Sequence, residues 1–320
     1  MSVAVEMQRA VGRDDPERGN GAMNTIVEVH RLTKSYGKVT AVKDVSFRME
    51  AGKIYGLLGR NGAGKTTIMQ TITAQLFPTG GEVKVFGESP YENHRVLSQV
   101  CFIKESQKYP SNYRVRDVLE MSALFFPNWD RDYALTLIED FRIPLKRKMK
   151  ALSRGMLSSV GIIVGLASRA PLTIFDEPYL GLDAVARVLF YDRLIADYAE
   201  HPRTVILSTH LIDEVSRLLE HVLVIDSGRL ILDEEAEALR GRAFAVAGPE
   251  SKVETFTRGK ELMAREALGA LVSATVLGPV DADEMRRAEA LGLEIAPVSL
   301  QQLVVHLTNQ PSERKAVEVR

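Results

Sequence analysis

The segment Gly59-Arg-Asn-Gly-Ala-Gly-Lys65-Thr66 constrains the fold more than any other part of this sequence, because it fits the pattern G-x-x-x-x-G-K-[ST]. An apolar run, Ile54–Leu58, precedes this segment, and Thr67–Phe77 is compatible with a helix. A buried strand, a glycine-rich loop and a helix are therefore predicted in that order. The alternative is a chance glycine turn before a helix, and the flanking strand and helix argue against it.

Such a loop binds the phosphates of a nucleotide. Glycines allow backbone N–H groups to turn toward phosphate oxygens, and the following helix adds the partial positive charge of its N-terminus. Lys65 is expected to reach the β- and γ-phosphates, and the hydroxyl of Thr66 to bind Mg²⁺. The motif alone specifies only a nucleotide phosphate, since kinases and GTPases share it. The residues expected to contact the phosphates are Gly59, Arg60, Asn61, Gly62, Ala63, Gly64, Lys65, Thr66 and Thr67.

A second apolar run, Leu172–Phe175, ends in two carboxylates, Asp176 and Glu177. Asp176 is suited to hold Mg²⁺, and Glu177 to polarise the attacking water as a general base. Neighbouring residues of a strand point to opposite faces, so both roles require the backbone to splay at the strand end. An ordinary strand followed by an acidic turn is the alternative.

Two further side chains are candidates for this site. His210 follows the apolar run Val205–Leu207, where it can hydrogen-bond the γ-phosphate and position water. Tyr36, in the segment Ser-Tyr-Gly-Lys, can stack on adenine. A structural histidine and a tyrosine in a surface turn are the respective alternatives.

Together these elements resemble the nucleotide-binding domain of the ABC transporter ATPases. The deciding segment is Leu152-Ser-Arg-Gly-Met156, which is similar to the family signature Leu-Ser-Gly-Gly-Gln. The order of the elements also matches over about residues 25–240. This order is Tyr36, the phosphate loop 59–66, the signature 152–156, the pair Asp176 and Glu177, the D-loop Gly181-Leu182-Asp183, and His210.

The resemblance implies an α/β fold: a P-loop NTPase of the ABC type with a mainly parallel sheet, an antiparallel β edge and a helical subdomain. In this family two domains pair head to tail, so Ser153, Arg154 and Gly155 of one copy, with Asp183, would complete the ATP site of the other. Lys65, Glu177 and His210 would be catalytic. Membrane permease subunits would be the partners, with the chain on the cytoplasmic, inner face of the cell membrane.

The resemblance leaves two rival functions. One is a soluble ABC ATPase that acts on nucleic acid or ribosomes, but such relatives carry paired domains, zinc cysteines or long coiled coils. This sequence has a single cysteine, Cys101, and one phosphate loop. The other is a binding module that uses ATP only as a switch. Glu177 and His210 favour hydrolysis over that alternative.

Three segments depart from the family pattern. Arg154 and Met156 replace glycine and glutamine, as in signatures of exporter ATPases for drugs, peptides or polysaccharides; Arg154 either contacts phosphate or, as we favour, is a solvated surface residue. Glu105 aligns with the usual Mg²⁺- or water-contacting glutamine, with Gln107 as the alternative. Tyr179, with Leu180, stands where small polar residues are common, which predicts a more apolar dimer seam.

Two surface segments invite interpretation. Residues 105–126, together with Trp129, have a high density of aromatic side chains, which suggests docking of a permease coupling helix or filling of a small helical core. The aromatic residues are Tyr109, Tyr113, Phe125, Phe126 and Trp129, and the apolar Leu124 lies among them. The basic cluster Lys146-Arg-Lys-Met-Lys150 can bind nucleic acid, but a solvated helix end is the favoured interpretation.

Length and composition set the domain organisation. The 320 residues allow one large α/β domain and a smaller one, and a net charge of −1 gives no global attraction to nucleic acid. The longest apolar run, Val160–Ala167, is far shorter than the roughly 20 residues of a spanning helix. We expect a disordered tail over 1–23, the ABC domain over 24–240 with its helical part at about 104–170, and a small α+β domain over 241–320 with a flexible end. In that last domain, 244–247 and 274–277 are expected as strands, 251–268 as a helix, and a final helix from Ser299.

Overall fold

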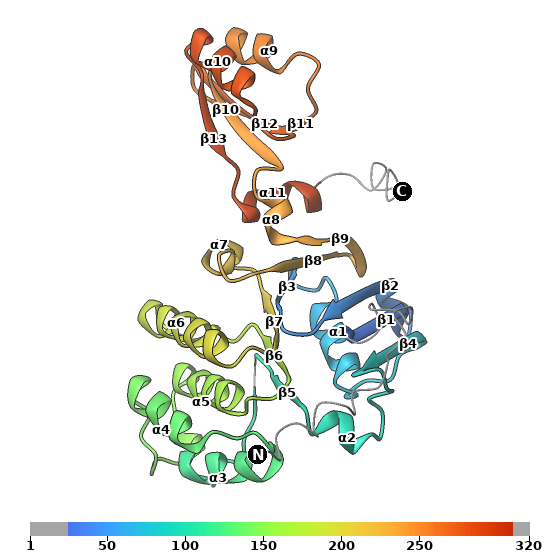
Figure 1. The fold of residues 1–320 in the computed structure, drawn as a ribbon, viewed down its shortest axis with the longest axis vertical. Helices are drawn as coiled ribbons and strands as arrows, with labels where there is room; N and C mark the ends of the chain where they lie inside the picture. Colours follow the sequence, from blue (N-terminus) through green and yellow to red (C-terminus); the bar gives the residue numbers. More distant parts are fainter. Residues whose placement is uncertain (1–24, 106, 310–320) are drawn as a thin grey trace, which may run out of the picture.

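Three sheets form the β structure in the computed structural model, which describes residues 25–105 and 107–309 (Figure 1). The largest has six strands in the order β5-β6-β7-β3-β8-β9, of which only β9 runs antiparallel to its neighbour. Its strands are β5 (Val100–Ile103), β6 (Leu172–Asp176), β7 (Thr204–Thr209), β3 (Ile54–Leu58), β8 (His221–Asp226) and β9 (Arg229–Glu235). The strands β3, β6 and β7 are buried along their whole length, as expected for a parallel sheet covered on both faces.

A three-stranded antiparallel sheet and a helix cover one face of this sheet. The strand order of the three-stranded sheet is β2-β1-β4, with β1 (Thr25–Tyr36), β2 (Val39–Glu50) and β4 (Gly80–Val85). Alternate residues of β3, Tyr55 and Leu57, pack on this side against Ile68 and Ile72 of α1 (Lys65–Ile72). The short helix α2 (His94–Leu97) follows β4. The period-two alternation of β3 therefore separates two cores.

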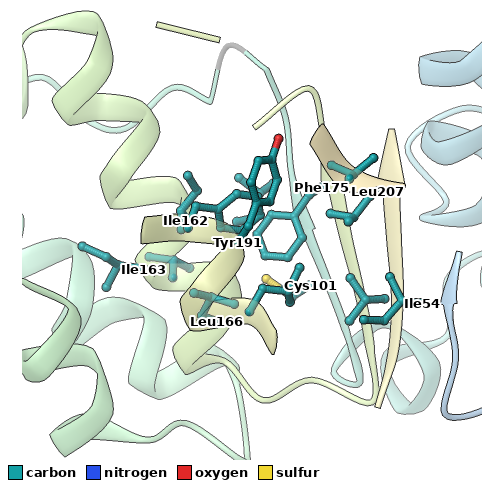
Figure 2. Packing of buried hydrophobic residues seen from close by; sticks show 14 of the residues in the cluster. Ile54, Cys101, Ile162, Ile163, Leu166, Phe175, Tyr191 and Leu207 are labelled. Atoms are coloured by element: carbon teal, nitrogen blue, oxygen red, sulfur yellow. The ribbon is translucent and has the colours of Figure 1, made fainter. Parts of the chain in front are cut away.

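Helices cover the opposite face, which Ile54 and Leu58 of β3 share with Phe175 and Leu207. In Figure 2, Phe175 and Cys101 of the sheet face Ile162 and Leu166 of α5 and Tyr191 of α6. The helices of this region are α3 (Val115–Phe125), α4 (Arg131–Asp140), the 3₁₀ turn η1 (Met149–Ala151), α5 (Arg154–Ala167), α6 (Ala184–Glu200), α7 (Ile212–Val215) and α8 (Ala236–Leu239). None of the helices between residues 25 and 309 is long and apolar enough to span a bilayer.

The chain after α8 builds a separate four-stranded antiparallel sheet in the order β11-β12-β10-β13. Its elements are β10 (Ala243–Pro249), α9 (Glu250–Thr257), β11 (Leu262–Leu268), β12 (Leu271–Leu277), α10 (Ala282–Leu291) and β13 (Glu294–Pro297). A separate core lies between one face of this sheet and its helices, and it includes Phe244, Val246 and Phe256. The last helix, α11 (Leu300–Asn309), returns to the larger core through Leu303 and Val304.

The elements expected from the sequence are found with two exceptions. The helix expected over 251–268 is wrong in its second half, because α9 ends at Thr257 and 262–268 forms β11. Arg258 leaves the helical conformation with φ of −59° and ψ of 121°, and Gly259 follows with φ of +82°, as in a type II turn. The N–H of Lys260 closes this turn by donating to the carbonyl oxygen of Thr257 at 2.9 Å. After this turn β11 pairs with β12. The helix expected to reach Phe77 ends at Ile72, with Ala74 at φ of +55°.

Two local features follow from the chemistry of their residues. Asp130 is the N-cap of α4, where its side chain accepts a hydrogen bond from the backbone N–H of Tyr133 at 2.8 Å. The turn between β8 and β9 holds Ser227 and Gly228, both at positive φ, as a tight hairpin requires. The expected tail over 1–23 and the chain beyond 309 lie outside the described residues, and the domain boundary near residue 240 stays a prediction.

Candidate nucleotide-hydrolysis site

The phosphate loop joins the end of β3 to the start of α1. Gly59 and Gly64 have φ of +147° and +110°, and an added Cβ would lie 2.2 Å from the carbonyl oxygen of Ile225 and 2.6 Å from that of Ala41, respectively. Only glycine fits both positions. Gly64 is the N-cap of α1 and supplies no side-chain cap, so the first N–H groups of the helix remain available to an anion.

The side chain of Lys65 is held by carbonyl groups of this loop. Its side chain is 7% exposed, and its Nζ donates hydrogen bonds to the carbonyl oxygens of Gly59 at 2.7 Å and Arg60 at 3.3 Å. The same Nζ lies 3.6 Å from Oε1 of Glu177. A buried ammonium group between carbonyl oxygens and a carboxylate is suited to exchange these partners for phosphate oxygens.

Thr66 and Asp176 form an oxygen-rich pair. The hydroxyl of Thr66 donates to Oδ2 of Asp176 at 2.8 Å, and Asp176 is 3% exposed. Its other oxygen, Oδ1, is buried and has no hydrogen-bond partner among the described residues. A hydroxyl beside a carboxylate with a free oxygen is the donor chemistry that Mg²⁺ prefers, so these two residues fit that ion.

The side chain of Glu177 lies on the same side of the strand end as that of Asp176 because the backbone of Glu177 has an unusual conformation. Its φ is +49°, in the left-handed region that L-residues rarely adopt, and this turn brings both carboxylates to one side of the strand end. Burial raises the pKa of the Glu177 carboxyl above its ordinary value, although the charges of Lys65 and His210 oppose the shift. The splayed strand end that two roles required is therefore present.

His210 extends this cluster from the end of the neighbouring strand β7. Its Nδ1 lies 2.9 Å from Oε2 of Glu177. A pocket of about 260 Å³ brings the remaining groups together: it is lined by Ala41, residues 61–67, Glu105, Asp176 and Glu177. Phosphate-binding backbone, a cation and two carboxylates thus meet at the carboxyl-terminal edge of three parallel strands.

The comparisons with known proteins agree with this geometry. Residues 42–180 match the family model described as ABC transporter. The bacitracin transport ATP-binding protein BcrA of Bacillus licheniformis is 31% identical over 224 residues, which cover 69% of this chain and 73% of that protein. The chain belongs to the ABC transporter family.

Other relatives of the family are similar over a comparable share of the chain. Nod factor export ATP-binding protein I of Rhizobium leguminosarum bv. viciae is 30% identical over 227 residues, covering 69% of this chain and 73% of that protein. A solved ATP-binding subunit of an ABC transporter superposes with a TM-score of 0.62 at 25% identity, covering 67% of this chain and 92% of that one. The chain is thus an ABC ATPase subunit with the α/β fold of that family.

The ABC signature lies away from the phosphate pocket of its own chain. Ser153 is the N-cap of α5, where its hydroxyl accepts a hydrogen bond from the N–H of Met156 at 3.2 Å. Gly155 packs against the D-loop, since a Cβ there would lie 2.6 Å from the carbonyl oxygen of Gly181. Asp183 caps α6 by accepting from the N–H of Ala186. The residues lining the pocket include neither the signature nor Asp183.

The departures from the ABC pattern have distinct environments. Glu105 lines the phosphate pocket, whereas Gln107 lines a neighbouring pocket of about 290 Å³. Arg154 is 72% exposed and its Nη2 lies 3.5 Å from Oε1 of Glu105. Tyr36 is 48% exposed, with Nζ of Lys34 5.3 Å from its ring centroid, and it does not line the pocket.

Tyr179 is the part of the site that the sequence did not reveal. The sequence suggested an apolar seam residue, but Tyr179 is 4% exposed and its hydroxyl contacts both Glu177 and His210. From the sequence alone, a tyrosine directly after Pro178 is expected in a surface turn. Its polar role depends on the position of the β7 end, which the sequence around Tyr179 does not encode.

Proposed function

We propose that this ABC ATPase subunit hydrolyses Mg²⁺-bound ATP at the pocket between β3, β6 and β7, as the motor of an export system. The observation that carries the proposal is the convergence of Lys65, Thr66, Asp176 and Glu177 on one pocket of about 260 Å³. Each brings a group that phosphoryl transfer needs: a cation, a hydroxyl and two carboxylates.

Each residue has a role in the proposed reaction. The N–H groups of the loop and Lys65 bind the β- and γ-phosphates. Thr66 and Asp176, with Glu105 at the pocket edge, would hold Mg²⁺, which when bound neutralises phosphate charge. Oε1 of Glu177 has no hydrogen-bond partner among the described residues and accepts the proton of the attacking water.

His210 is proposed to link the base to the γ-phosphate. As an imidazolium, His210 would donate from Nδ1 to Oε2 of Glu177, 2.9 Å away, and from Nε2 to the phosphate. This arrangement couples the orientation of the carboxylate to the presence of nucleotide. Tyr36 remains a candidate for adenine stacking because its ring is exposed at the end of β1, the central strand of the antiparallel sheet.

A head-to-tail dimer is the proposed active form. Ser153, Arg154, Gly155 and Asp183 do not line the pocket of their own chain, so they are available to complete the pocket of a second copy or a homologous subunit. The N-terminus of α5, capped by Ser153, presents backbone N–H groups to an anion. The exposed guanidinium of Arg154 is compatible with either a phosphate contact or a solvated role.

Export and a membrane partner are proposed from the relatives and from one surface. The relatives named for bacitracin transport and Nod factor export support export. Leu124 and Phe125, at the end of α3, are 79% and 67% exposed and suit a permease coupling segment. Tyr109, Tyr113, Phe126 and Trp129 instead pack partly buried against the core. The chain would then lie on the inner face of the cell membrane.

Rate and mass measurements on the purified chain and Glu177→Gln test the proposal. We expect the wild type to release phosphate from Mg²⁺-ATP, and the variant to lose about 10²- to 10⁴-fold in kcat and to persist as an ATP-dependent dimer. Glu266→Gln, the same change at an exposed position of β11, should keep the wild-type rate. A Glu177→Gln variant with normal turnover would show that Glu177 is not the base.

A further inference from the structure

We propose that Tyr179 is a positioning residue for ATP hydrolysis: its hydroxyl anchors Oε2 of Glu177 and the backbone of His210, and so leaves Oε1 of Glu177 directed to water. The inference rests on the proposed role of Glu177 as the base. It assigns a function to a residue that departs from the small polar residues common at this position of the family.

Four contacts surround the Tyr179 hydroxyl. It accepts hydrogen bonds from Oγ1 of Thr209 at 3.0 Å and from the backbone N–H of His210 at 3.1 Å. It also contacts Oε2 of Glu177 and lies 3.0 Å from Nδ1 of His210. The side chain is buried, so water does not compete for these bonds.

The donors and acceptors of this cluster can be assigned by counting. A tyrosine hydroxyl has one proton and accepts up to two hydrogen bonds. Thr209 and the N–H of His210 fill both acceptor positions, so the single proton is directed at the carboxylate of Glu177. The proton on Nδ1 of His210 is then directed at the same oxygen, 2.9 Å away. Oε2 of Glu177 therefore receives two donors.

The other oxygen of Glu177 remains free. Oε1 is buried, has no hydrogen-bond partner among the described residues, and lies 3.6 Å from Nζ of Lys65, beside the phosphate loop. A carboxylate fixed through one oxygen loses rotational freedom and presents the other in a single direction. The hydroxyl of Tyr179 thus determines which oxygen of Glu177 serves as the base.

Tyr179 also joins two strand ends. Glu177 follows β6, whereas Thr209 ends β7 and His210 follows it. The rings of Tyr179 and His210 pack edge to face with centroids 5.6 Å apart. Phenylalanine would keep this ring contact and lose every hydrogen bond. Substitution of Tyr179 by phenylalanine, which removes one oxygen atom, therefore separates the packing role from the positioning role.

The proton balance of the reaction is unchanged by this assignment. The oxygen of water forms a bond to the γ-phosphorus, the bond from that phosphorus to the bridging oxygen of ADP breaks, and the water proton moves to Oε1 of Glu177. The phenolic proton stays on Tyr179 throughout. Tyr179 acts only through the orientation of Glu177 and His210.

Steady-state ATP hydrolysis by Tyr179→Phe tests the inference. The loss of a hydrogen bond to a charged group predicts a fall of about 10- to 100-fold in kcat, with KM for ATP and the unfolding temperature close to those of the control. The control is Tyr55→Phe, which removes another buried hydroxyl, bonded to the backbone N–H of Glu50 at the far end of β3.

The double variant Tyr179→Phe/Glu177→Gln separates the two proposals. If Tyr179 acts through Glu177, its substitution should not lower the residual rate of Glu177→Gln further. An equal fall in both backgrounds, an unchanged kcat in the single variant, or a joint loss of kcat, ATP affinity and thermal stability would each overturn the positioning role. Normal turnover by Glu177→Gln alone would instead refute the proposed base.

Discussion

The six-stranded sheet and the four-stranded C-terminal sheet differ in strand direction, and this difference decides where a site can form. In the first, β3, β6 and β7 are parallel neighbours, so the phosphate loop, Asp176 and His210 meet at one edge. In the second, every neighbouring pair is antiparallel and successive strand ends alternate between two edges. Helices pack on both sheets, so helix packing alone does not create the site.

Several charged residues around the four-stranded sheet form ion pairs with one another and do not gather at one pocket. Lys260 pairs with Glu284, and Arg265 of β11 reaches Glu250 and Glu254 of α9. The corresponding lysine of the nucleotide site, Lys65, is tied to loop carbonyls and to a buried carboxylate. The same residue type therefore forms a surface ion pair in one region and, in the other, holds the position proposed for phosphate binding.

Substitution of these two lysines should give the largest contrast. Lys65→Ala removes charge-assisted hydrogen bonds to two phosphates and should weaken ATP binding by about 10²- to 10³-fold, or about 3–4 kcal/mol. Lys260→Ala should leave ATP affinity unchanged. Calorimetric titration with ATP measures both, and equal losses would mean that the C-terminal domain contributes to the nucleotide site.

Much of this contrast could be predicted from the sequence. The resemblance to the ABC family implied a mainly parallel sheet, and the apolar runs before Gly59, Asp176 and His210 indicated strands followed by these residues. Parallel packing then brings those strand ends together. The antiparallel domain was harder to predict: the segment after Gly259 has no strong alternation, so a continuous helix was expected there. Pairing with β12 determines its conformation as β11.

The finer chemistry of the site could not be predicted. The left-handed backbone of Glu177 follows from its attachment to the β7 end, where its N–H donates to the carbonyl oxygen of Ser208 at 3.1 Å. The hydrogen bonds of Tyr179 depend on the same strand end. Both features join segments far apart in the chain, and local sequence patterns do not encode such contacts.

Glycine substitutions should distinguish the rigidity of the two cores. A Cβ on Gly165 of α5 would lie 2.4 Å from Cε1 of Phe175, and one on Gly248 of β10 would lie 2.4 Å from Cδ2 of Leu293. The ring of Phe175 is fixed against Phe190, whereas the end of Leu293 can rotate away. Gly165→Ala should therefore cost about 1–2 kcal/mol, after the helix propensity that alanine adds, and Gly248→Ala less than about 1 kcal/mol.

Urea unfolding followed by circular dichroism checks these two values. Equal losses would mean that the central core relaxes as readily as the smaller one. Since neither glycine lines the phosphate pocket, the folded fraction of each variant should keep its ATP affinity.

The smallest loss of stability is expected where His221 begins β8, at the edge of the six-stranded sheet opposite to the nucleotide site. Burial lowers the pKa of His221, but the hydrogen bonds and charges of Asp233 and Glu235 outweigh it and raise the pKa above 6.5. This contribution to stability is fully present below the unfolded pKa and is lost as the pH rises through the folded one. Asp233→Asn should therefore destabilise the protein more at pH 6 than at pH 9 without changing kcat.

Unfolding curves of the wild type and Asp233→Asn at both pH values measure this difference. A pH-independent loss would assign the stabilisation to β8–β9 pairing alone. A changed kcat would show that the edge with His221 and the edge with the nucleotide site are coupled, contrary to the prediction.

The positive φ of Glu177 has a consequence for protein engineering. A side chain in this conformation costs about 1–3 kcal/mol, a cost that glycine avoids. Selection for thermal stability alone would therefore favour glycine at this position, and with it the loss of the carboxylate. With Glu177 as the proposed base, stability and turnover would oppose each other at a single residue, so any heat-resistant variant changed at position 177 needs its ATP turnover measured before use.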